Sequence, residues 1–214
     1  MQDRAAGLIL AAGASTRMGK PKQLLPVQGT TLLERVITEA LNSLLNKVFL
    51  ILGYRAEEIK NALSGVLLNK KLKIIENKAY AQGISTSIIA GVSEVADTYD
   101  HVMLLLADMP CINARLIDLL LRRYLDSHLP LGAIQIKSKR SHPVIFSRRL
   151  YPELMELRGD VGGRALFRKY RDQACLVDPG FSYDDSDIDT PEDYADFNTS
   201  LARRIADSDD DTKY

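Results

Sequence analysis

Two kinds of charged residue in this sequence could together bind a metal ion and a phosphorylated ligand. Asp108, Asp187 and Asp189 carry carboxylates, and Arg17 and Lys22 carry positive charges near the amino terminus. Magnesium prefers one or two carboxylates together with phosphate oxygens and water, while Arg and Lys neutralise phosphate charge directly. The pattern therefore indicates a metal-dependent phosphate site, provided that the fold brings these five residues together.

The cations lie in a segment that begins as a strand and continues as a loop. Residues 6–11 form an apolar run, and the loop that follows contains Gly13 and Gly19. Glycines allow backbone N–H groups to approach an anion, and the cations supply charge that the backbone lacks. The spacing fits neither the Gly-x-x-x-x-Gly-Lys-Ser/Thr phosphate loop nor the Gly-x-Gly-x-x-Gly dinucleotide fingerprint. An ordinary basic loop between a strand and a helix is the simpler interpretation.

The acidic residues also have simpler structural explanations. Asp108 follows the most apolar segment of the chain and precedes Met109-Pro110, where an aspartate commonly starts a turn. Asp187 and Asp189 precede a Thr-Pro pair that can begin a helix, which explains the pair but not the run of acids. We therefore expect Asp108 and Asp189 to be the metal ligands, with Asp187 as the less favoured alternative.

Three further motifs have polar residues that could contact a ligand. Segment 82–87 places three hydroxyls at a predicted helix start, where capping accounts for one and the others could contact a base or ribose. His142 stands beside a predicted strand, where a lone histidine is more often structural than catalytic. Asp160 and Arg164 belong to a glycine-rich segment that is either a plain loop or a second phosphate site.

The composition argues against several kinds of partner. The chain has 214 residues, 46% of them hydrophobic and 26% charged, and 28 cations balance 28 anions. This balance gives no overall field to attract nucleic acid or a membrane surface. Cys111 and Cys175 are far apart and belong to no metal-binding motif. Because no apolar run approaches the ~20 residues of a membrane span and no signal peptide precedes the first strand, we expect a cytoplasmic protein.

The elements that must position these residues alternate between apolar strands and amphipathic helices. Such alternation predicts a mainly parallel α/β sheet, whose carboxyl edge would receive both the Gly13 loop and Asp108. The later strands would form a small antiparallel extension. We expect one domain over residues 1–206 and a disordered acidic tail over residues 207–214. The predicted strands are residues 6–11, 47–53, 72–75, 101–107, 131–136, 143–146 and 174–177; the predicted helices are residues 31–45, 57–63, 113–127, 149–157 and 162–170, with further helix starts at 84 and 190.

Six motif segments follow one another along the chain. They are Leu10-Ala-Ala-Gly13 through Lys22, Gly83-x-Ser-x-Ser87, Leu105-x-x-Asp-Met-Pro110, His142-Pro-Val-x-Phe146, Gly159-Asp-x-Gly-x-Arg164 and Asp187-x-Asp-Thr-Pro-Glu-Asp193. In this order they resemble the MobA-like nucleotidyltransferases, and most closely the molybdenum cofactor cytidylyltransferase branch. The resemblance extends from residue 6 to about residue 200. One such motif would be weak, whereas the ordered set is specific.

The resemblance implies a Rossmann-like, three-layer α/β/α nucleotidyltransferase fold and a role for each matched residue. Arg17, Lys22 and Asp108 would be the catalytic residues, with both cations on the triphosphate. Asp108 and Asp189 would hold Mg²⁺. The nucleotide would be bound by Leu10, Ala11, Ala12, Gly13, Arg17, Lys22, Gly83, Ser85, Ser87 and Asp108, and the acceptor by His142, Asp160 and Arg164.

The same resemblance favours CTP as the donor and the terminal phosphate of molybdopterin as the acceptor. Guanylyl-transferring relatives typically have glycine where this chain has Ala12, and tend to have Asn rather than Asp near the last helix. Ser141 and Gly163 depart from the family pattern, and both departures fall in the segments assigned to the acceptor. The acceptor phosphate, already ionised near neutral pH, would attack the α-phosphorus of CTP and release pyrophosphate. A molybdenum-dependent hydroxylase or its maturation factor would be a partner.

Other functions stay open on the sequence alone. A GTP-using molybdopterin guanylyltransferase, or a cytidylyltransferase for a sugar or polyol phosphate, would use the same donor loop. A non-catalytic protein that delivers the cofactor to a molybdenum hydroxylase would need the loop but not both metal carboxylates. A nicotinamide-dependent oxidoreductase is a further class, because a relative of this branch is described as reducing a pigment, but the dinucleotide fingerprint is missing.

Overall fold

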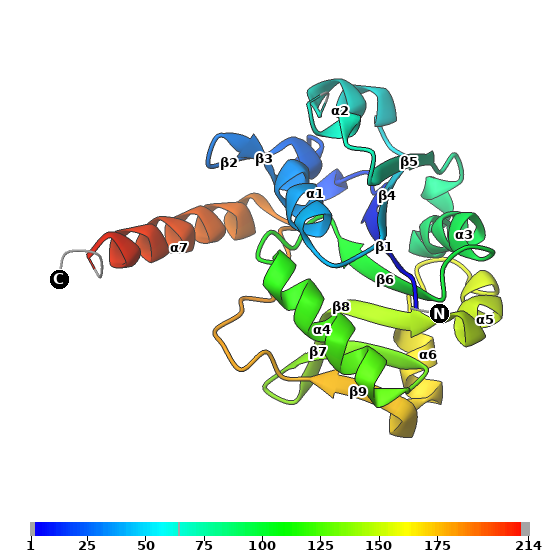
Figure 1. Cartoon of the computed structure of the whole chain (residues 1–214). Coiled ribbons are helices and arrows are strands. Elements are labelled where there is room, and N and C mark those ends of the chain that lie inside the picture. Colours follow the sequence, from blue (N-terminus) through cyan, green and yellow to red (C-terminus); the bar gives the residue numbers. More distant parts are fainter. Residues whose placement is uncertain (1–2, 64, 211–214) are drawn as a thin grey trace.

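A seven-stranded, mainly parallel sheet forms the centre of the molecule (Figure 1). The computed structural model describes residues 3–63 and 65–210. The strand order is β5-β4-β1-β6-β8-β7-β9, and every neighbouring pair is parallel except the two pairs that include β8. The strands are β1 (Ala5–Ala11), β4 (Lys47–Leu52), β5 (Leu72–Glu76), β6 (His101–Leu106), β7 (Leu131–Ile136), β8 (Lys139–Ser147) and β9 (Ala174–Val177). A separate two-stranded antiparallel sheet joins β2 (Pro26–Val27) to β3 (Thr30–Thr31).

Helices cover both faces of the sheet, as Figure 1 shows. On one face, Ile9 of β1 packs in a cluster with Leu33 of α1 and Leu116 of α4; on the other, Leu8 packs with Val92 of α3. Because both faces are buried, β1 is a continuous apolar run rather than an alternating one. The helices are α1 (Leu32–Asn42), α2 (Ala56–Ala62), α3 (Ile84–Val95), α4 (Ala114–Ser127), α5 (Tyr151–Met155), α6 (Arg164–Lys169) and α7 (Pro191–Asp210).

The strand order places a topological switch beside β1. The chain leaves β1 for β4 on one side, and later returns to place β6 on the other side of β1. The loops after β1 and β6 therefore leave the same edge in different directions, which opens a crevice at the carboxyl ends of these strands. β8 runs antiparallel to its neighbours, so its first residues, from Lys139, lie at this same edge. The predicted three-layer, mainly parallel fold is confirmed.

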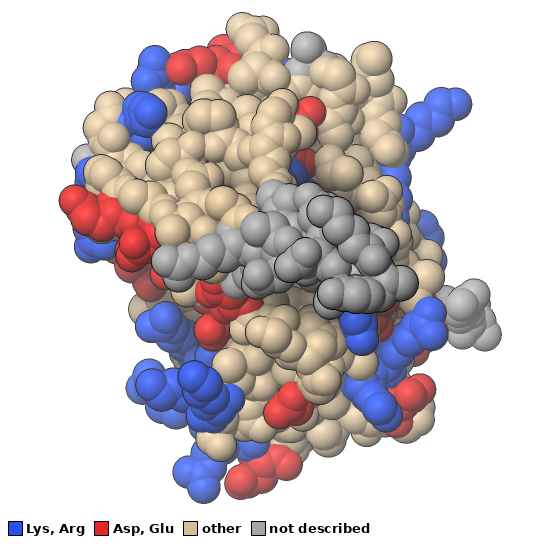
Figure 2. Space-filling view, turned by 90° about the vertical axis from the view of Figure 1, so that its left-hand side faces the viewer, with Lys and Arg blue, Asp and Glu red and all other residues tan. Residues whose placement is uncertain are grey.

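The carboxyl-terminal helix extends away from the body of the molecule (Figure 1). Its first half is held by Phe197, which packs with Leu25, Val27, Leu32 and Ile188. The helix continues through Asp210 and so includes the first residues of the segment that we expected to be disordered; residues 211–214 lie outside the described residues. On the face from which α7 projects, Figure 2 shows Lys and Arg side chains interspersed with Asp and Glu. Within the described chain, no helix has both the length and the apolar character that crossing a membrane requires.

The predicted boundaries differ from the structure mainly in the second half of the chain. The strand expected at 143–146 begins at Lys139, and the helices expected at 149–157 and 162–170 are limited to α5 and α6. These helices are short because a glycine-bearing loop separates them and 3-10 turns flank them. The sequence located the starts of α1 and α4 more accurately than these boundaries. Thr31 caps α1 by accepting from the N–H of Glu34, and Asn113 caps α4 by accepting from the N–H of Leu116.

Candidate nucleotide and metal site

A buried glutamine fixes the loop that follows β1. The Nε2 of Gln23 donates to the backbone oxygens of Ala11 (3.0 Å) and Gly13 (3.1 Å), and its Oε1 lies 3.2 Å from the Ser15 hydroxyl. Ser15 also accepts from the backbone N–H of Lys22 at 3.2 Å. Because Gln23 is only 3% exposed, these bonds form away from competing water. The loop is therefore folded back on its own strand, with Gly13 facing open space.

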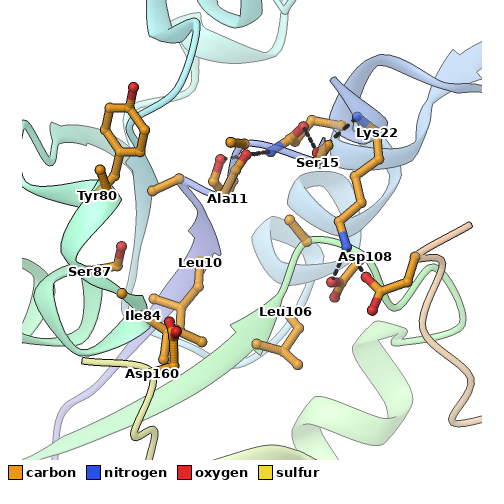
Figure 3. A pocket seen from close by; sticks show the side chains of 18 of the residues that line it. Leu10, Ala11, Ser15, Lys22, Tyr80, Ile84, Ser87, Leu106, Asp108 and Asp160 are labelled. Atoms are coloured by element: carbon orange, nitrogen blue, oxygen red, sulfur yellow. Dashed lines mark hydrogen bonds and ion pairs between the residues drawn. The ribbon is translucent and has the colours of Figure 1, made fainter. Parts of the chain in front are cut away.

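Lys22 connects this loop to the acidic residues on the other side of the crevice. Its Nζ lies 2.6 Å from Asp108 Oδ2 and 2.6 Å from Asp189 Oδ1, and Figure 3 shows the side chain reaching toward Asp108. Burial alone would lower the pKa of Lys22, but the two carboxylates more than offset it and raise the pKa above its ordinary value. Lys22 is therefore a fixed positive charge. Arg17 is a looser one, since its guanidinium is 3.4 Å from Asp189 and largely exposed.

The three aspartates are brought together by one buried residue. Ile188 is 2% exposed and packs under α7, and its backbone N–H donates to the carbonyl oxygen of Asp108 at 2.9 Å. This bond holds Asp187 and Asp189, on either side of Ile188, against the loop after β6. Carboxylate oxygens of Asp108, Asp187 and Asp189 lie within 4.8 Å of one another. The two segments, far apart in sequence, thus form one acidic cluster.

The acidic cluster has the chemistry of a site for a hard divalent cation. Its donors are all carboxylate oxygens, the ligands that Mg²⁺ and Mn²⁺ prefer. Oδ1 of Asp108 is buried and has no hydrogen-bond partner among the described residues. Partial burial, followed by the negative charge of Asp108, raises the pKa of Asp187. Within the described part of the chain, these three carboxylates face two cations, Lys22 and Arg17, so the residues present fit an additional positive ion.

The start of α7 fixes the orientation of Asp189. Asp193 accepts hydrogen bonds from the backbone N–H groups of Asp189 (3.0 Å) and Thr190 (2.8 Å), and the Thr190 hydroxyl accepts from the N–H of Asp193 at 3.2 Å. An interaction of the Thr190 hydroxyl with the Asp193 carboxylate, followed by the bonds from these two backbone N–H groups, lowers the pKa of Asp193. The predicted helix start at Thr190 is confirmed, and it has a second consequence. The cap holds the backbone of Asp189 next to Lys22.

The opposite wall of the crevice comes from the start of α3 and the loop before it. Tyr80, Ile84 and Ser87 lie across from Lys22 and Asp108 in Figure 3. Asn77, which is 5% exposed, donates from Nδ2 to the hydroxyl of Ser87 at 3.0 Å and so orients it. This wall contains no cation among its lining residues, whereas the other carries Lys22 and Arg17. The crevice therefore carries cations on one side only, and Asp160 lies beside Ile84 on the other (Figure 3).

A cavity of 640 Å³ lies between these walls. Most of the predicted nucleotide and metal residues line it, namely Leu10, Ala11, Ala12, Gly13, Arg17, Lys22, Gly83, Ser87, Asp108 and Asp189. Ser85 does not line it: its side chain is 1% exposed and faces the interior. Helical geometry explains the difference, because residues two apart on a helix point in nearly opposite directions, so that Ser87 faces the cavity and Ser85 faces away.

The predicted acceptor residues border a second, adjoining cavity of 300 Å³. His142, Asp160 and Arg164 all line it, and Asp160 lines the first cavity as well. The Asp160 loop is attached to α3 by a close backbone contact at Gly83, which has φ +105°. A Cβ on Gly83 would lie 2.3 Å from the carbonyl carbon of Gly159, so only glycine fits.

His142 is directed to this edge by an irregularity in β8. Ala133 pairs with Val144, whereas Ile134 pairs with Ser141, so that His142 and Pro143 form a bulge in the strand. Burial lowers the pKa of His142 to about 4, although a hydrogen bond to the backbone of Leu104 acts in the opposite direction. At neutral pH the imidazole is therefore uncharged. His142 then has no imidazolium proton to donate as a general acid.

Several residues at the site were not found by sequence reasoning. Gln23, Tyr80, Ile84 and Leu106 line the first cavity. Gln23 carried the clearest available signal, because a polar residue between Lys22 and the apolar Leu24-Leu25 pair has to satisfy its amide if it is buried. The others are apolar or aromatic residues whose exposure at a cavity depends on tertiary packing.

The open, mainly parallel sheet, with a basic loop and an acidic cluster at its switch point, defines an α/β protein of the nucleotidyltransferase class. The MobA-like NTP transferase domain matches residues 7–174. The chain therefore belongs to the MobA-like NTP transferase family, and the recognition made from its six motifs is confirmed.

Known relatives and solved structures agree with this family. The chain is 29% identical over 198 residues to a nicotine blue oxidoreductase of Paenarthrobacter nicotinovorans, covering 87% of this chain and 92% of that protein. It is 36% identical over 105 residues to the molybdenum cofactor cytidylyltransferase of Escherichia coli strain K12, covering 49% and 52%. A crystal structure of the homologue of Mycobacterium tuberculosis Rv0371c from Mycobacterium sp. strain JC1 superposes with a TM-score of 0.81 at 28% identity, covering 95% and 99%. The crystal structure of Rv0371c of M. tuberculosis H37Rv in complex with manganese superposes with a TM-score of 0.69 at 26% identity. The match covers 92% of this chain and 99% of that one.

Replacing Lys22 by methionine should increase the affinity of the nucleotide-free protein for a divalent cation. The ammonium group competes for oxygens of Asp108 and Asp189, so its removal should tighten Mn²⁺ binding about tenfold. Mn²⁺ binding can be measured by electron paramagnetic resonance. Lys20→Met is the matched control, since Lys20 lies in the same loop and lines neither cavity. Equal or weaker Mn²⁺ binding by Lys22→Met would contradict this assignment of Lys22.

Replacing Gln23 by alanine should loosen the loop while both cations of the crevice, Arg17 and Lys22, are retained. The loss of its buried hydrogen bonds should lower the free energy of unfolding by about 1–3 kcal/mol. Nucleotide binding, measured by isothermal titration calorimetry, should weaken because Gly13 and Lys22 are no longer held. The exposed Gln173 gives the control variant Gln173→Ala, which should leave both quantities unchanged. If Gln23→Ala bound the nucleotide as tightly as the unmodified protein, Gln23 would not be needed to hold the loop in its binding conformation.

The neutral state of His142 predicts a pH dependence of stability. With a folded-state pKa of about 4, below the ordinary value of 6.5, the unfolded chain takes up a proton between these pH values that the folded chain does not. Stability should therefore fall as the pH falls from about 6.5 to 4, and His142→Gln should reduce this loss by up to about 3 kcal/mol. Urea unfolding across this pH range measures it. An unchanged slope would mean that the imidazole of His142 titrates normally in the folded protein.

Proposed function

We propose that the protein transfers CMP from CTP to the terminal phosphate of molybdopterin, with Mg²⁺ as cofactor and pyrophosphate as the second product. The observation that carries this proposal is the acidic cluster of Asp108, Asp187 and Asp189, bridged by Lys22, at the rim of a cavity of 640 Å³. A triphosphate needs charge neutralisation on one side and space for a nucleoside on the other, and this cavity offers both.

The two walls of the cavity suggest how the nucleotide is oriented. Arg17 and Lys22 would bind the triphosphate on the charged side. The base and ribose would lie against the side without cations, in contact with Gly83 and Ser87, with the end of β1 and the start of its loop between the two sides. CTP is preferred to GTP because Ala12 stands where guanylyl-transferring relatives typically have glycine. Asp108 and Asp189 would hold the metal, with Asp187 as the alternative to Asp189.

The reaction forms a bond between an oxygen of the acceptor phosphate and the α-phosphorus of CTP, and breaks the bond from that phosphorus to the bridging oxygen of pyrophosphate. When bound, Mg²⁺ supplies positive charge that stabilises the phosphates as charge develops on them. Arg17 and Lys22 neutralise the leaving pyrophosphate, and the rigid loop held by Gln23 keeps Lys22 in place. A phosphate monoester needs no strong general base, which agrees with the neutral His142.

The acceptor would approach through the adjoining cavity, which His142, Asp160 and Arg164 line. The similarity to the E. coli molybdenum cofactor cytidylyltransferase supports a pterin phosphate as the acceptor and CTP as the donor. A molybdenum-dependent hydroxylase, or a factor that matures it, is the corresponding partner protein. The metal ligands argue against a protein that only delivers the cofactor, because delivery needs no metal–triphosphate centre.

Three other reactions serve as alternatives. The nicotine blue oxidoreductase matches the greater part of the chain, which makes reduction of a pigment the candidate from another class. The loop after β1 lacks the dinucleotide fingerprint, so this alternative is weaker. Transfer of a nucleotidyl group to a sugar or polyol phosphate, or from GTP to molybdopterin, would use the same acidic cluster.

A panel of donors and acceptors should separate these reactions. Each NTP is incubated with Mg²⁺ and molybdopterin, or with sugar and polyol phosphates, and pyrophosphate release is measured; oxidation of NAD(P)H by nicotine blue is followed in parallel. We expect release with CTP and molybdopterin. Release only with GTP or a sugar phosphate, or pigment reduction without any pyrophosphate, would overturn the proposed specificity.

Replacing Asp108 by asparagine should leave the fold intact and lower turnover at least about a hundredfold, because a metal ligand at the reacting phosphates is lost. Circular dichroism checks the fold, and pyrophosphate release checks turnover. Asp97→Asn is the matched control, since Asp97 is an exposed acid on the surface, outside the acidic cluster. Normal turnover by Asp108→Asn would exclude this cluster as the reaction centre.

A further inference from the structure

The second cavity has a different character from the first. Its volume is 300 Å³, and it shares Leu10, Ile84, Leu106 and Asp160 with the larger cavity. A molecule bound there would therefore meet a nucleotide bound in the first cavity across a common wall. The walls that belong to the second cavity alone are largely apolar and include Ile88, Leu104, Val144 and Phe167.

Two arginines add positive charge to this apolar cavity. Arg140 comes from β8 and Arg164 from α6, and both line the cavity. The guanidinium carbon of Arg140 lies 4.4 Å from the centre of the Phe167 ring, a cation–π contact that fixes one end of the long side chain at the wall. Partial burial, and then the positive charge of Arg164, lower the pKa of Arg140.

These like charges have no carboxylate partner in an ion pair. None of the ion pairs within residues 3–63 and 65–210 includes Arg140 or Arg164. This contrasts with Lys22 in the first cavity, which two aspartates hold. Both arginines are exposed, and Asp160, which lines the same cavity, forms no ion pair with either of them. Two guanidiniums at one cavity suit an anion with several oxygens, because each can form paired hydrogen bonds to it.

We propose that Arg140 and Arg164 together bind the phosphate monoester of the acceptor, and that the apolar walls of the second cavity hold a planar ring attached to it. Arg140 is then a specificity-determining residue for the acceptor, and it lies outside the sequence motifs. This inference rests on the proposed transfer reaction for its biological meaning, but the binding chemistry can be tested apart from it. The triphosphate stays with Arg17 and Lys22, which line only the first cavity.

The walls favour a ring over a polyol. Against Ile88, Leu104 and Val144, the hydroxyl groups of a polyol would lose water without replacement. The hydrogen-bonding side chains of Ser141, His142 and Asp160 belong to other parts of the lining. A flat ring instead buries apolar surface, with Phe167 beside it for an aromatic contact. The cavity can therefore select between phosphate monoesters by the part of the molecule that does not react.

Phenyl phosphate is a suitable probe, because it combines a planar ring with a phosphate monoester and is not specific to any one acceptor. Binding to the full-length protein is measured by calorimetry in the presence of Mg²⁺ and a non-hydrolysable CTP analogue. We expect phenyl phosphate to bind more tightly than glycerol phosphate, and Arg140→Gln and Arg164→Gln each to weaken it about tenfold or more. Arg140→Lys should restore only part of the affinity, since an ammonium lacks the planar fork.

The matched controls are Lys139→Gln on the same strand and Arg168→Gln on the same helix. Both are exposed cations that line neither cavity, and both should bind phenyl phosphate as the unmodified protein does. Affinity for the CTP analogue should stay within about twofold in all five variants. Equal binding of phenyl phosphate and glycerol phosphate, or no effect of Arg140→Gln, would overturn the inference. If Arg140→Gln instead lost binding of the CTP analogue, Arg140 would belong to the nucleotide site and the inference would be wrong.

Kinetics with molybdopterin then distinguish this inference from the proposed function. If CMP transfer occurs, Arg140→Gln should raise the KM for molybdopterin about tenfold while kcat and the KM for CTP change by less than about twofold. If no transfer occurs but phenyl phosphate binds through Arg140, the proposed reaction fails and the anion site stands. If transfer occurs and the KM for molybdopterin is unchanged in Arg140→Gln, the anion site fails and the reaction stands.

Discussion

The gathering of three carboxylates at one point is the constraint on which the arrangement of this site depends. Asp108, Asp187 and Asp189 lie within 4.8 Å of one another and would repel each other without a compensating cation. The fold supplies one such cation in Lys22 and brings the two acidic segments together through the backbone bond from Ile188 to Asp108. Electrostatics and hydrophobic burial thus act together, because Ile188 is buried in the same cluster that anchors α7.

The sheet topology decides which side chains can join this acidic cluster. Parallel strands place the loop after β1 and the loop after β6 at one edge, where the strand order switches direction. The reversal of β8 brings a second set of residues to that edge from the opposite end of a strand. Arg140 and His142 lie in the first half of β8, at the same edge of the sheet as residues that follow β1 and β6. One antiparallel strand therefore adds a second cavity to a parallel-sheet site.

The parts that the sequence predicted are those governed by local pattern. Continuous apolar runs defined the strands, and the position of Asp108 after the strongest run placed it at the sheet edge. Capping at Thr190 was likewise a local signal, confirmed by the bonds with Asp193. The parts it did not predict depend on contacts between distant segments. Gln23 became important only because it folds back on β1, and Arg140 only because α6 places Phe167 beneath it.

The wall shared by the two cavities links their chemistry. Asp160 borders both, and its loop is held against the start of α3 by the backbone contact at Gly83, where a side chain would collide with Gly159. The side of the first cavity without cations and the loop of the second are therefore one rigid unit, while the side with cations belongs to the loop after β1. Except on α3, the residues that line only the first cavity and those that line only the second come from different elements. The elements that carry Lys22 and Asp108 are not those that carry Arg140 and Arg164, so the lining of the second cavity can vary without changing the acidic cluster.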